Sequence, residues 1–279
     1  MPKLSVITIN YNNASGLQRT IESVVAQQYS DMEYIVVDGG STDESLEIIK
    51  HHEKFINKWV SEKDNGIYNA LNKGIKMATG DYLLFLNSGD HFYDSEVLNK
   101  YHHHIEKEDL IAFDIHMFGL GYDYIHKHPE KIQLSFLFEE TFAHQSVFIK
   151  RTLFDKIGLY DETLKVVADW KFFIHAIVLK CTYKKVPNVL STFYFGGISS
   201  TAEGTFIRRK EREIVLRSEF ELYYDDYKLL QTQTQKLNTN RFKLLAEIEK
   251  SKIGRKVMSF FLRFCVTLFS KKKLKDILN

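Results

Sequence analysis

Short apolar runs alternate with amphipathic segments over the first hundred residues, and this alternation restricts the fold more than any other feature of the chain. The apolar, often β-branched runs predict strands at 4–9, 34–37, 58–60 and 82–86. The intervening segments have the spacing of amphipathic helices and cover 15–27, 43–51 and 67–78. Strands alternating with helices of this size predict an α/β fold. Its parallel sheet would carry helices on both faces and every strand-to-helix loop on one edge.

The fourth of these runs ends in a small polar loop that carries a carboxylate. Residues 83–86 are entirely apolar, as in a strand buried on both faces, and Asn87, Ser88 and Gly89 follow as turn residues. Asp90 is then presented at the carboxyl edge of the sheet, where open α/β folds bind their ligands. A carboxylate at this place is able to hold a divalent cation against a phosphate.

Composition limits the class of protein. With 279 residues, 44% of them hydrophobic, the chain is long enough for one large domain, or for one domain and an appendage. The two cysteines, Cys181 and Cys265, lie far apart in apolar stretches. They favour a reducing compartment and predict neither a disulfide framework nor a zinc site. Residues 1–4 lead directly into a strand and lack the apolar region of a signal peptide.

The last thirty residues are strongly basic. Nine Lys or Arg and one Asp give 250–279 a charge of +8, which leaves −6 on the rest of this +2 chain. An apolar run between Lys256 and Lys271 is interrupted by Arg263, so it is too short and too polar to span a membrane comfortably. It predicts an interfacial helix on an anionic membrane, with 271–273 at the headgroups. The alternative is a helix packed on the domain or in a homodimer. Nucleic acid is not expected as a partner, because the aromatic residues form one apolar block.

Four motifs occur in order along the first part of the chain: SVITINYN at 5–12, IVVDGGSTD at 35–43, DNGIYNALNKG at 64–74 and FLNSGD at 85–90. With them the chain resembles family 2 glycosyltransferases of the GT-A fold, densely over 3–100 and more thinly to about residue 200. The resemblance implies a Rossmann-like sheet that binds a nucleotide-sugar donor, usually a UDP-sugar.

The resemblance assigns six residues to the nucleotide: Thr8, Tyr11, Asp38, Asp64, Asn69 and Lys73. Tyr11 would line the base pocket by stacking, Asp38 would bind the base edge, and Lys73 would pair with phosphate. From the residues alone, Asp38 also fits an Asx turn or a helix cap, and Asp43 is expected to be structural.

Asp90 would be the metal-binding end of the family's Asp-x-Asp motif, where Mg²⁺ or Mn²⁺ bridges the diphosphate. Ser88 occupies the first Asp position, so affinity for the metal would depend more on the oxygens of the diphosphate and on water. Ser88 and Gly89 would lie beside the donor sugar. The missing carboxylate keeps open an alternative, a nucleotide-sugar-binding protein without catalysis.

The base that deprotonates the acceptor is expected just before a helix in the later half, and Asp169 in VVADWKFF fits that place. The neighbouring Trp170 is either a platform for a sugar or part of the core. His144 and Gln145 would contact the donor sugar or its phosphates, or form a hydrogen-bonded loop pair. The loop 195–200 contains two glycines and would close over the diphosphate.

These features predict a GT-A domain at 1–202, with a nucleotide-binding half at 1–100 and an acceptor half at 101–202, followed by a helical extension at 203–279. The predicted activity is inverting transfer of a sugar to a saccharide or lipid-linked acceptor, in surface polysaccharide or glycolipid synthesis. The predicted location is the cytoplasmic face of a bacterial membrane. A nucleotidyltransferase of similar fold is the other enzymatic alternative. It is disfavoured because the loop at 10–13 is neither glycine-rich nor basic.

Overall fold

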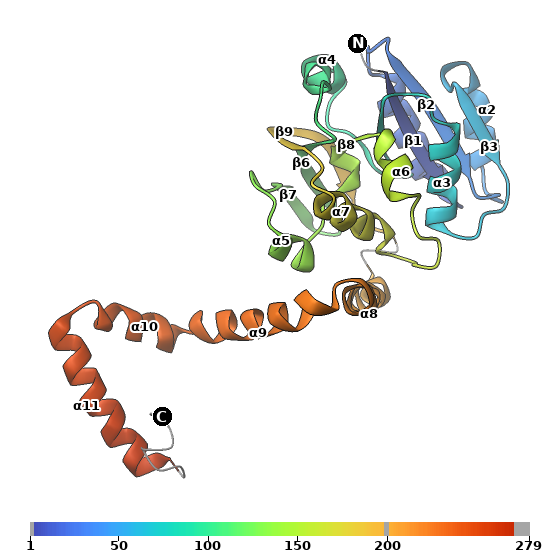
Figure 1. The fold of residues 1–279 in the computed structure, drawn as a ribbon. Coiled ribbons are helices and arrows are strands. Elements are labelled where there is room, and N and C mark those ends of the chain that lie inside the picture. The colour runs from blue at the N-terminus through green and yellow to red at the C-terminus, as the bar shows by residue number, and fades with distance from the viewer. Residues whose placement is uncertain (1–2, 198–200, 271–279) are drawn as a thin grey trace. The chain divides into compact units, whose positions relative to one another are not determined.

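The computed structural model describes residues 3–197 and 201–270 and divides into two units, Met1–Val215 and Leu216–Asn279 (Figure 1). The first unit contains a nine-stranded sheet. Its first four strands in chain order are β1 (Leu4–Asn10), β2 (Met32–Asp38), β3 (Lys58–Ser61) and β4 (Tyr82–Phe85). They pair in parallel in the order β3-β2-β1-β4, which confirms the predicted parallel sheet. Asn10 of β1 lies opposite Asp38 of β2, so these strands end at the same edge.

Helices cover both faces of this sheet, as predicted. One face is covered by α1 (Ala14–Val25), α2 (Ser45–His51) and α4 (Val97–Tyr101). Leu17, Ile49 and Leu98 from these helices are fully buried with Val36 of β2 in a single core cluster. The amphipathic spacing of the sequence thus identified helices that bury one stripe against the sheet.

The opposite face is covered by α3 (Ile67–Met77), α6 (Thr152–Ile157) and α7 (Ala168–Val178), which Figure 1 shows with the strands behind them. Gly74 of α3 lies so close to Ile7 of β1 that an added Cβ would stand 2.4 Å from an Ile7 methyl group. Phe154 of α6 stacks on Phe172 of α7, with ring centroids 4.4 Å apart, and meets Phe85 of β4 edge to face. Close backbone approach therefore holds α3 against the sheet, and aromatic packing holds α6 and α7 there.

The remaining strands extend the sheet past β4: β8 (Val147–Lys150), β6 (Leu110–Gly119), β9 (Tyr183–Tyr194), β5 (His91–Phe92) and the hairpin strand β7 (Tyr122–His126). β8 is antiparallel to both β4 and β6, and β9 is parallel to β6. β6 and β9 therefore run in the same direction as β1–β4 and finish at the same edge. β9 is continuous across Pro187, because the register shifts where this proline lies and the ladder resumes at Val189.

The shorter elements of the first unit are α5 (Leu134–Glu139) and the 3₁₀ turns η1 (Glu53–Phe55), η2 (His102–His104) and η3 (His144–Ser146). The extension is helical, as predicted: α8 (Ala202–Glu219), α9 (Glu221–Leu237), α10 (Asn240–Glu249) and α11 (Lys252–Phe269). The first unit takes in α8 as far as Val215, beyond the expected boundary at residue 202. α9 continues without a break through the polar stretch at 231–235. Among the residues described, no helix is long and apolar enough to cross a membrane.

Candidate active site

Asp38 ends β2 and organises the loop that follows it. Its carboxylate is fully buried and accepts hydrogen bonds from Asn10 Nδ2 (2.8 Å), from Ser61 Oγ (2.7 Å), and from both the backbone amide and the hydroxyl of Ser41 (2.9 and 2.5 Å). Burial alone would raise the pKa of Asp38, but these donors outweigh it and hold the pKa below its ordinary value. The structure therefore places Asp38 beneath the loop as its organiser. A contact with the base edge stays a prediction.

Three loops meet beside Asp38. A Cβ added to Gly39 would lie 2.4 Å from Asp64 Oδ2 and 3.3 Å from Tyr11 Cδ2, so a larger residue would displace the Asp64 carboxylate. The Tyr11 side chain is 65% exposed, and its ring is open to a planar ligand. Asp64 accepts a hydrogen bond from the Gly66 amide through Oδ1 (2.9 Å). Tyr11 and Asp64 are thus brought together at the sheet edge, where the sequence predicted a nucleotide pocket.

Three other predicted nucleotide contacts already have protein partners. Thr8 is buried and accepts a hydrogen bond from Tyr34 Oη (3.1 Å). Asn69 donates to Glu162 Oε2 (2.8 Å), and Lys73 Nζ lies 2.7 Å from Glu62 Oε1.

Each of these partners comes from the protein's own framework. The Asn69 bond joins α3 to the turn before α7, and the Lys73 pair joins α3 to the loop after β3. A nucleotide role at Thr8, Asn69 or Lys73 stays a prediction. Asp43 is structural as expected, since its carboxylate accepts from the backbone amides of Ala14 and Ser45.

Asp90 lies at the end of the loop after β4 and is only 4% exposed. It accepts two hydrogen bonds from other residues, from Gln145 Nε2 to Oδ2 (3.0 Å) and from the Tyr194 amide to Oδ1 (3.2 Å). Burial raises the pKa of Asp90 to about 6, although both hydrogen bonds act in the opposite direction. Gly89 adopts φ +111°, a conformation that favours glycine, and its amide donates to Thr20 Oγ1 (2.9 Å).

The surroundings of Asp90 fit a divalent cation. No ion pair to Asp90 is found among the described residues, and the effect of burial on its pKa exceeds that of its hydrogen bonds. The described part of the chain has no cluster of three His, Cys, Asp or Glu side chains able to hold a metal. Mg²⁺, however, is commonly bound by one or two carboxylates together with substrate phosphates. One buried carboxylate beside a diphosphate therefore suffices, and the role of Asp90 as the protein ligand stays a prediction.

Asp169 opens α7 and both of its oxygens are engaged. Tyr68 Oη donates to Oδ1 (2.9 Å), and His144 Nδ1 lies 2.9 Å from Oδ2. Burial opposes ionisation of Asp169, but the hydrogen bond and charge of His144 and the Tyr68 hydroxyl together keep its pKa below the ordinary value. These two contacts fix the orientation of the Asp169 carboxylate.

His144 and Gln145, neighbours in η3, connect Asp169 with Asp90. His144 faces Asp169 through Nδ1 and Asn87 through Nε2 (Nδ2 to Nε2, 3.3 Å), while Gln145 bonds Asp90. Both side chains were expected at the donor sugar; the structure places them between the loop of Asp90 and α7. Asn87 Oδ1 is a buried acceptor without a partner among the described residues.

Trp170 is not a platform for a sugar. It is 1% exposed, its indole nitrogen donates to the Leu137 carbonyl, and the Arg212 guanidinium lies 5.0 Å from the ring centroid. A ring enclosed in this way has no free face, so the alternative interpretation as core is the right one. The proposed lid begins at Phe195, whose amide donates to the Phe118 carbonyl (2.8 Å); its residues 198–200 lie outside the described part of the chain.

Sequence reasoning gave no role to Tyr68, Asn87 or Tyr194. Tyr68 and Asn87 belong to motifs that were identified, at NGIY and FLNSGD. Their partners, however, are far away in the sequence: Tyr68 and Asp169 are 101 positions apart, and Tyr194 and Asp90 are 104 apart. Tyr194 contributes its backbone amide, and because almost every residue type has one, the sequence gives no signal for this role.

Comparison with known proteins gives relatives of one kind. The model of "Glycosyl transferase family 2" matches residues 5–162. A "PGL/p-HBAD biosynthesis glycosyltransferase" of Mycobacterium tuberculosis is 32% identical over 218 residues, which cover 75% of this chain and 84% of that protein. An uncharacterized glycosyltransferase of the same species is 35% identical over 208 residues, covering 72% and 79%.

Solved structures show the same architecture. S. aureus TarS 1–349 in complex with UDP-GlcNAc superposes with a TM-score of 0.56 at 18% identity, over 70% of this chain and 59% of TarS 1–349. The mannosyltransferase PcManGT from Pyrobaculum calidifontis, in complex with GDP-Man and Mn²⁺, has a TM-score of 0.57 at 14% identity, over 97% of this chain and 88% of that one. At such identities the likeness shows the fold, which is GT-A. The family model and the sequence relatives carry the assignment: this chain belongs to glycosyl transferase family 2 and is a glycosyltransferase.

Proposed function

We propose that this enzyme transfers a sugar, with inversion, from a nucleotide-sugar to a saccharide or lipid-linked acceptor, and that the donor is a UDP-sugar. The buried Asp90 carboxylate carries the proposal, because it lies at the same sheet edge as Tyr11 and Asp64 and forms no ion pair among the described residues. The relative whose name refers to PGL/p-HBAD biosynthesis supports a glycolipid acceptor, and the UDP-GlcNAc complex of TarS supports a UDP-sugar donor.

Different residues bind the nucleotide, hold the metal and accept the proton in this proposal. The base of the nucleotide stacks on Tyr11, and the diphosphate lies toward Asp90. Asp90 would hold Mg²⁺ or Mn²⁺, which neutralises charge on the departing nucleoside diphosphate. The pair formed by Asp169 and His144 takes the proton of the acceptor hydroxyl while its oxygen attacks the anomeric carbon. A single displacement of this kind inverts the configuration of that carbon.

Calorimetric titration with UDP, with and without Mn²⁺, tests the donor site. Wild type is expected to bind UDP more tightly with Mn²⁺, and Asp90→Ala to lose that dependence. Asp94→Ala is the matched control, since Asp94 is an exposed carboxylate four residues further along, paired with Lys100 (3.0 Å). Metal-independent binding of UDP by wild type would contradict the role of Asp90.

Release of UDP from UDP-sugars separates an enzyme from a binding protein. Wild type is expected to release UDP in the presence of acceptor, and the anomeric configuration of the product, read by NMR, tests inversion. Retention of UDP-sugars without turnover would favour the alternative, a protein that binds the donor without catalysis.

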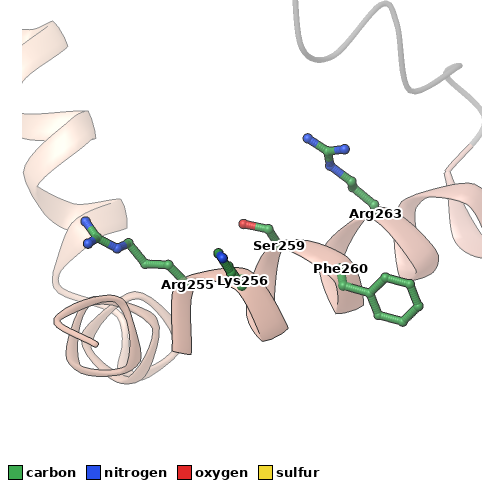
Figure 2. A pocket seen from close by; sticks show the side chains of 5 residues that line it. All are labelled: Arg255, Lys256, Ser259, Phe260 and Arg263. Carbon is green, nitrogen blue, oxygen red and sulfur yellow. The ribbon is translucent and has the colours of Figure 1, made fainter. Parts of the chain in front are cut away.

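We also propose that α11 attaches the enzyme to the cytoplasmic face of an anionic membrane, which would bring a lipid-linked acceptor within reach. Six exposed apolar side chains recur at helical spacing: Ile253, Val257, Phe260, Phe261, Phe264 and Leu268. Figure 2 shows Arg255, Ser259 and Arg263 projecting to one side of α11 and Phe260 to the other. An exposed apolar face with a basic face opposite it supports interfacial binding to anionic lipid.

Co-sedimentation with vesicles tests this attachment. The protein is expected to pellet with phosphatidylcholine vesicles that contain phosphatidylglycerol, and much less with phosphatidylcholine alone. The double substitution Phe260→Glu and Phe264→Glu should abolish pelleting, whereas Leu229→Glu with Leu230→Glu, at exposed positions of α9, should leave it unchanged. Equal pelleting of both double variants would contradict a membrane role for α11.

A further inference from the structure

The chain that leads into α7 is held by a carboxylate of α8. α7 carries Asp169 in its first turn, and its N-cap residue, Val167, makes no side-chain hydrogen bond to the helix. Just before it, the backbone amides of Lys165 and Val166 donate to Glu211, the first to Oε1 (2.7 Å) and the second to Oε2 (3.0 Å). Hydrogen bonds from amides to a carboxylate are roughly twice as strong as those between neutral groups. Glu211 therefore fixes the path of the chain as it enters α7.

The next residue of α8, Arg212, holds the other side of Asp169. Its guanidinium carbon lies 5.0 Å from the ring centroid of Trp170, which directly follows Asp169. Trp170 Nε1 donates to the Leu137 carbonyl, and Arg212 Nη1 donates to the Glu139 carbonyl (2.6 Å). Both carbonyls lie near the end of α5, where backbone acceptors have no partner within the helix. Thus α5, α7 and α8 interlock at the residue beside Asp169.

The Asp169 carboxylate itself is held from other elements. Tyr68 Oη of α3 donates to Oδ1, and His144 Nδ1 of η3 lies near Oδ2, both at 2.9 Å. Asp169 is therefore held through its side chain by α3 and η3, and through its neighbours in the chain by α8. Displacement of a catalytic group by as little as 1 Å is able to cost about 10²-fold in rate.

Stability by itself gives a poor reason for an arginine at position 212. Its Nε is buried and has no hydrogen-bond partner among the described residues. A buried donor without an acceptor costs free energy that an apolar side chain of similar size would avoid. The guanidinium also interacts with the charge of Asp169, and although burial lowers its pKa to about 10, Arg212 stays protonated at neutral pH. Arg212 thus combines packing on Trp170 with a positive charge toward Asp169.

We propose that Glu211 and Arg212 are positioning residues that keep the Asp169 carboxylate in place for catalysis. They act through the backbone of 165–170 and through Trp170. This inference rests on the proposed function, in which Asp169 belongs to the pair that takes the proton of the acceptor. Both residues lie within the first unit, Met1–Val215, although the sequence assigned them to the helical extension. The part of α8 that carries them therefore belongs to the catalytic unit.

Histidine signals in NMR spectra test the placement of Asp169 without any turnover. The full chain is labelled at histidine, and the ring signals of His144 are identified by their loss in His144→Gln. Because His144 Nδ1 lies 2.9 Å from Asp169, a displaced carboxylate should shift these signals in Glu211→Ala and in Arg212→Met. A lower free energy of unfolding would not by itself move the signals of the folded state, so the shift separates positioning from a merely structural role.

The same helix supplies matched controls. Glu203→Ala and Arg209→Met change exposed side chains of α8 and should leave the His144 signals at their wild-type positions. Glu211→Gln keeps one acceptor oxygen for the two amides and should give a smaller shift than Glu211→Ala. Thermal unfolding verifies that each variant is folded.

Hydrolysis of the donor, with water as acceptor, tests the consequence for catalysis. UDP release is measured with UDP-GlcNAc, UDP-glucose and UDP-galactose in the presence of Mn²⁺, and kcat is expressed per site that binds UDP. Glu211→Ala is expected to lower kcat by roughly 10–10²-fold while KM for the donor and affinity for UDP change little. Glu211→Gln should lose less, and Glu203→Ala nothing.

Two results would overturn the inference while leaving the proposed function intact. One is a set of His144 signals that stays at the wild-type positions in both Glu211→Ala and Arg212→Met. The other is a shift of these signals with kcat still within about twofold of wild type, because a displaced base costs more than that. Failure of wild type to release UDP from all three donors would instead overturn the proposed function and the inference together.

Discussion

Asp38 ends β2 and Asp90 lies in the loop after β4, and both carboxylates are buried, yet their environments are opposite. Asp38 accepts hydrogen bonds from the side chains of Asn10, Ser41 and Ser61, which lie in its own loop and in neighbouring strands. These bonds lower its pKa. Asp90 accepts from Gln145 and the Tyr194 amide, and burial raises its pKa to about 6. The protein supplies a full set of hydrogen-bond donors to Asp38, whereas Asp90 has no ion pair with a cationic side chain among the described residues.

The comparison separates a carboxylate with a structural role from one with a candidate functional role at this edge. A buried ionised group whose donors are complete stabilises the folded chain. A buried ionised group whose donors are incomplete costs stability, and it persists where a ligand compensates it. Asp38 therefore behaves as an organiser of the loop that carries Gly39, while the environment of Asp90 supports the proposed cation site.

The largest effect is expected at Asp38. Asp38→Ala removes the common acceptor of Asn10, Ser41 and Ser61 and leaves buried donors unpaired. We expect the free energy of unfolding to fall by about 4 kcal/mol, in the range for breaking buried networks of charged hydrogen bonds. Urea unfolding measures it, with Asp94→Ala as the control for an exposed carboxylate. A loss below about 1 kcal/mol would show that Asp38 is not the organiser of its loop.

Asp90 is expected to behave in the opposite way when no metal is present. Asp90→Asn should raise the free energy of unfolding at about pH 8 by on the order of 2 kcal/mol, because it removes an uncompensated buried charge. The sign follows from the raised pKa. Ionisation costs wild type nothing below its unfolded pKa of about 3.9, and the cost grows as the pH rises toward the folded pKa. It is then constant above about 6.

Unfolding curves in a chelating buffer between pH 4 and 8 measure the difference between Asp90→Asn and wild type. The gap should widen up to about pH 6 and then stay level. A variant that is less stable than wild type throughout this range would show that the charge of Asp90 is already compensated, which would abolish the contrast with Asp38.

The smallest effect is expected at Ser88, which stands at the position of the missing carboxylate. Both the hydroxyl and the backbone carbonyl of Ser88 accept a hydrogen bond from Asn13 Nδ2 (3.3 and 3.0 Å). The partly exposed Ser88 side chain is thereby held within the loop that carries Asp90. Ser88→Asp is expected to strengthen Mn²⁺ binding in the presence of UDP by roughly tenfold, through a second carboxylate near the ion. Calorimetry measures it, and Ser88→Asn controls for added bulk. Equal gains in both variants would indicate that charge at this position is not what limits the metal.

The first half of the fold was predictable because its signals are local. Apolar periodicity identified the first four parallel strands of the sheet and the three helices between them, and the GT-A assignment followed from motifs within each strand-to-loop junction. The later half was predicted less well. A proline cannot donate to a ladder, and a register shift lets β9 continue past Pro187, which no local pattern showed.

The candidate site was predictable as a set of positions at one edge. Tyr11, Asp64, Asp90 and Asp169 were all named from the sequence, and the structure gives each a place at or beside that edge. The state of each group was not predictable. Whether Asp38 or Asp90 is satisfied depends on donors that the chain brings from Ser61, Gln145 and Tyr194.

By itself, the sequence determined the order of strands and helices, the edge at which the loops gather and the residue types available there, because those depend on neighbours within a few positions. Only the tertiary structure decided that Trp170 is core, that His144 serves Asp169, and that Asp90 alone among these carboxylates has its pKa raised to about 6. Burial and hydrogen bonds between residues up to 104 positions apart set those outcomes, and neither quantity is encoded in any local pattern.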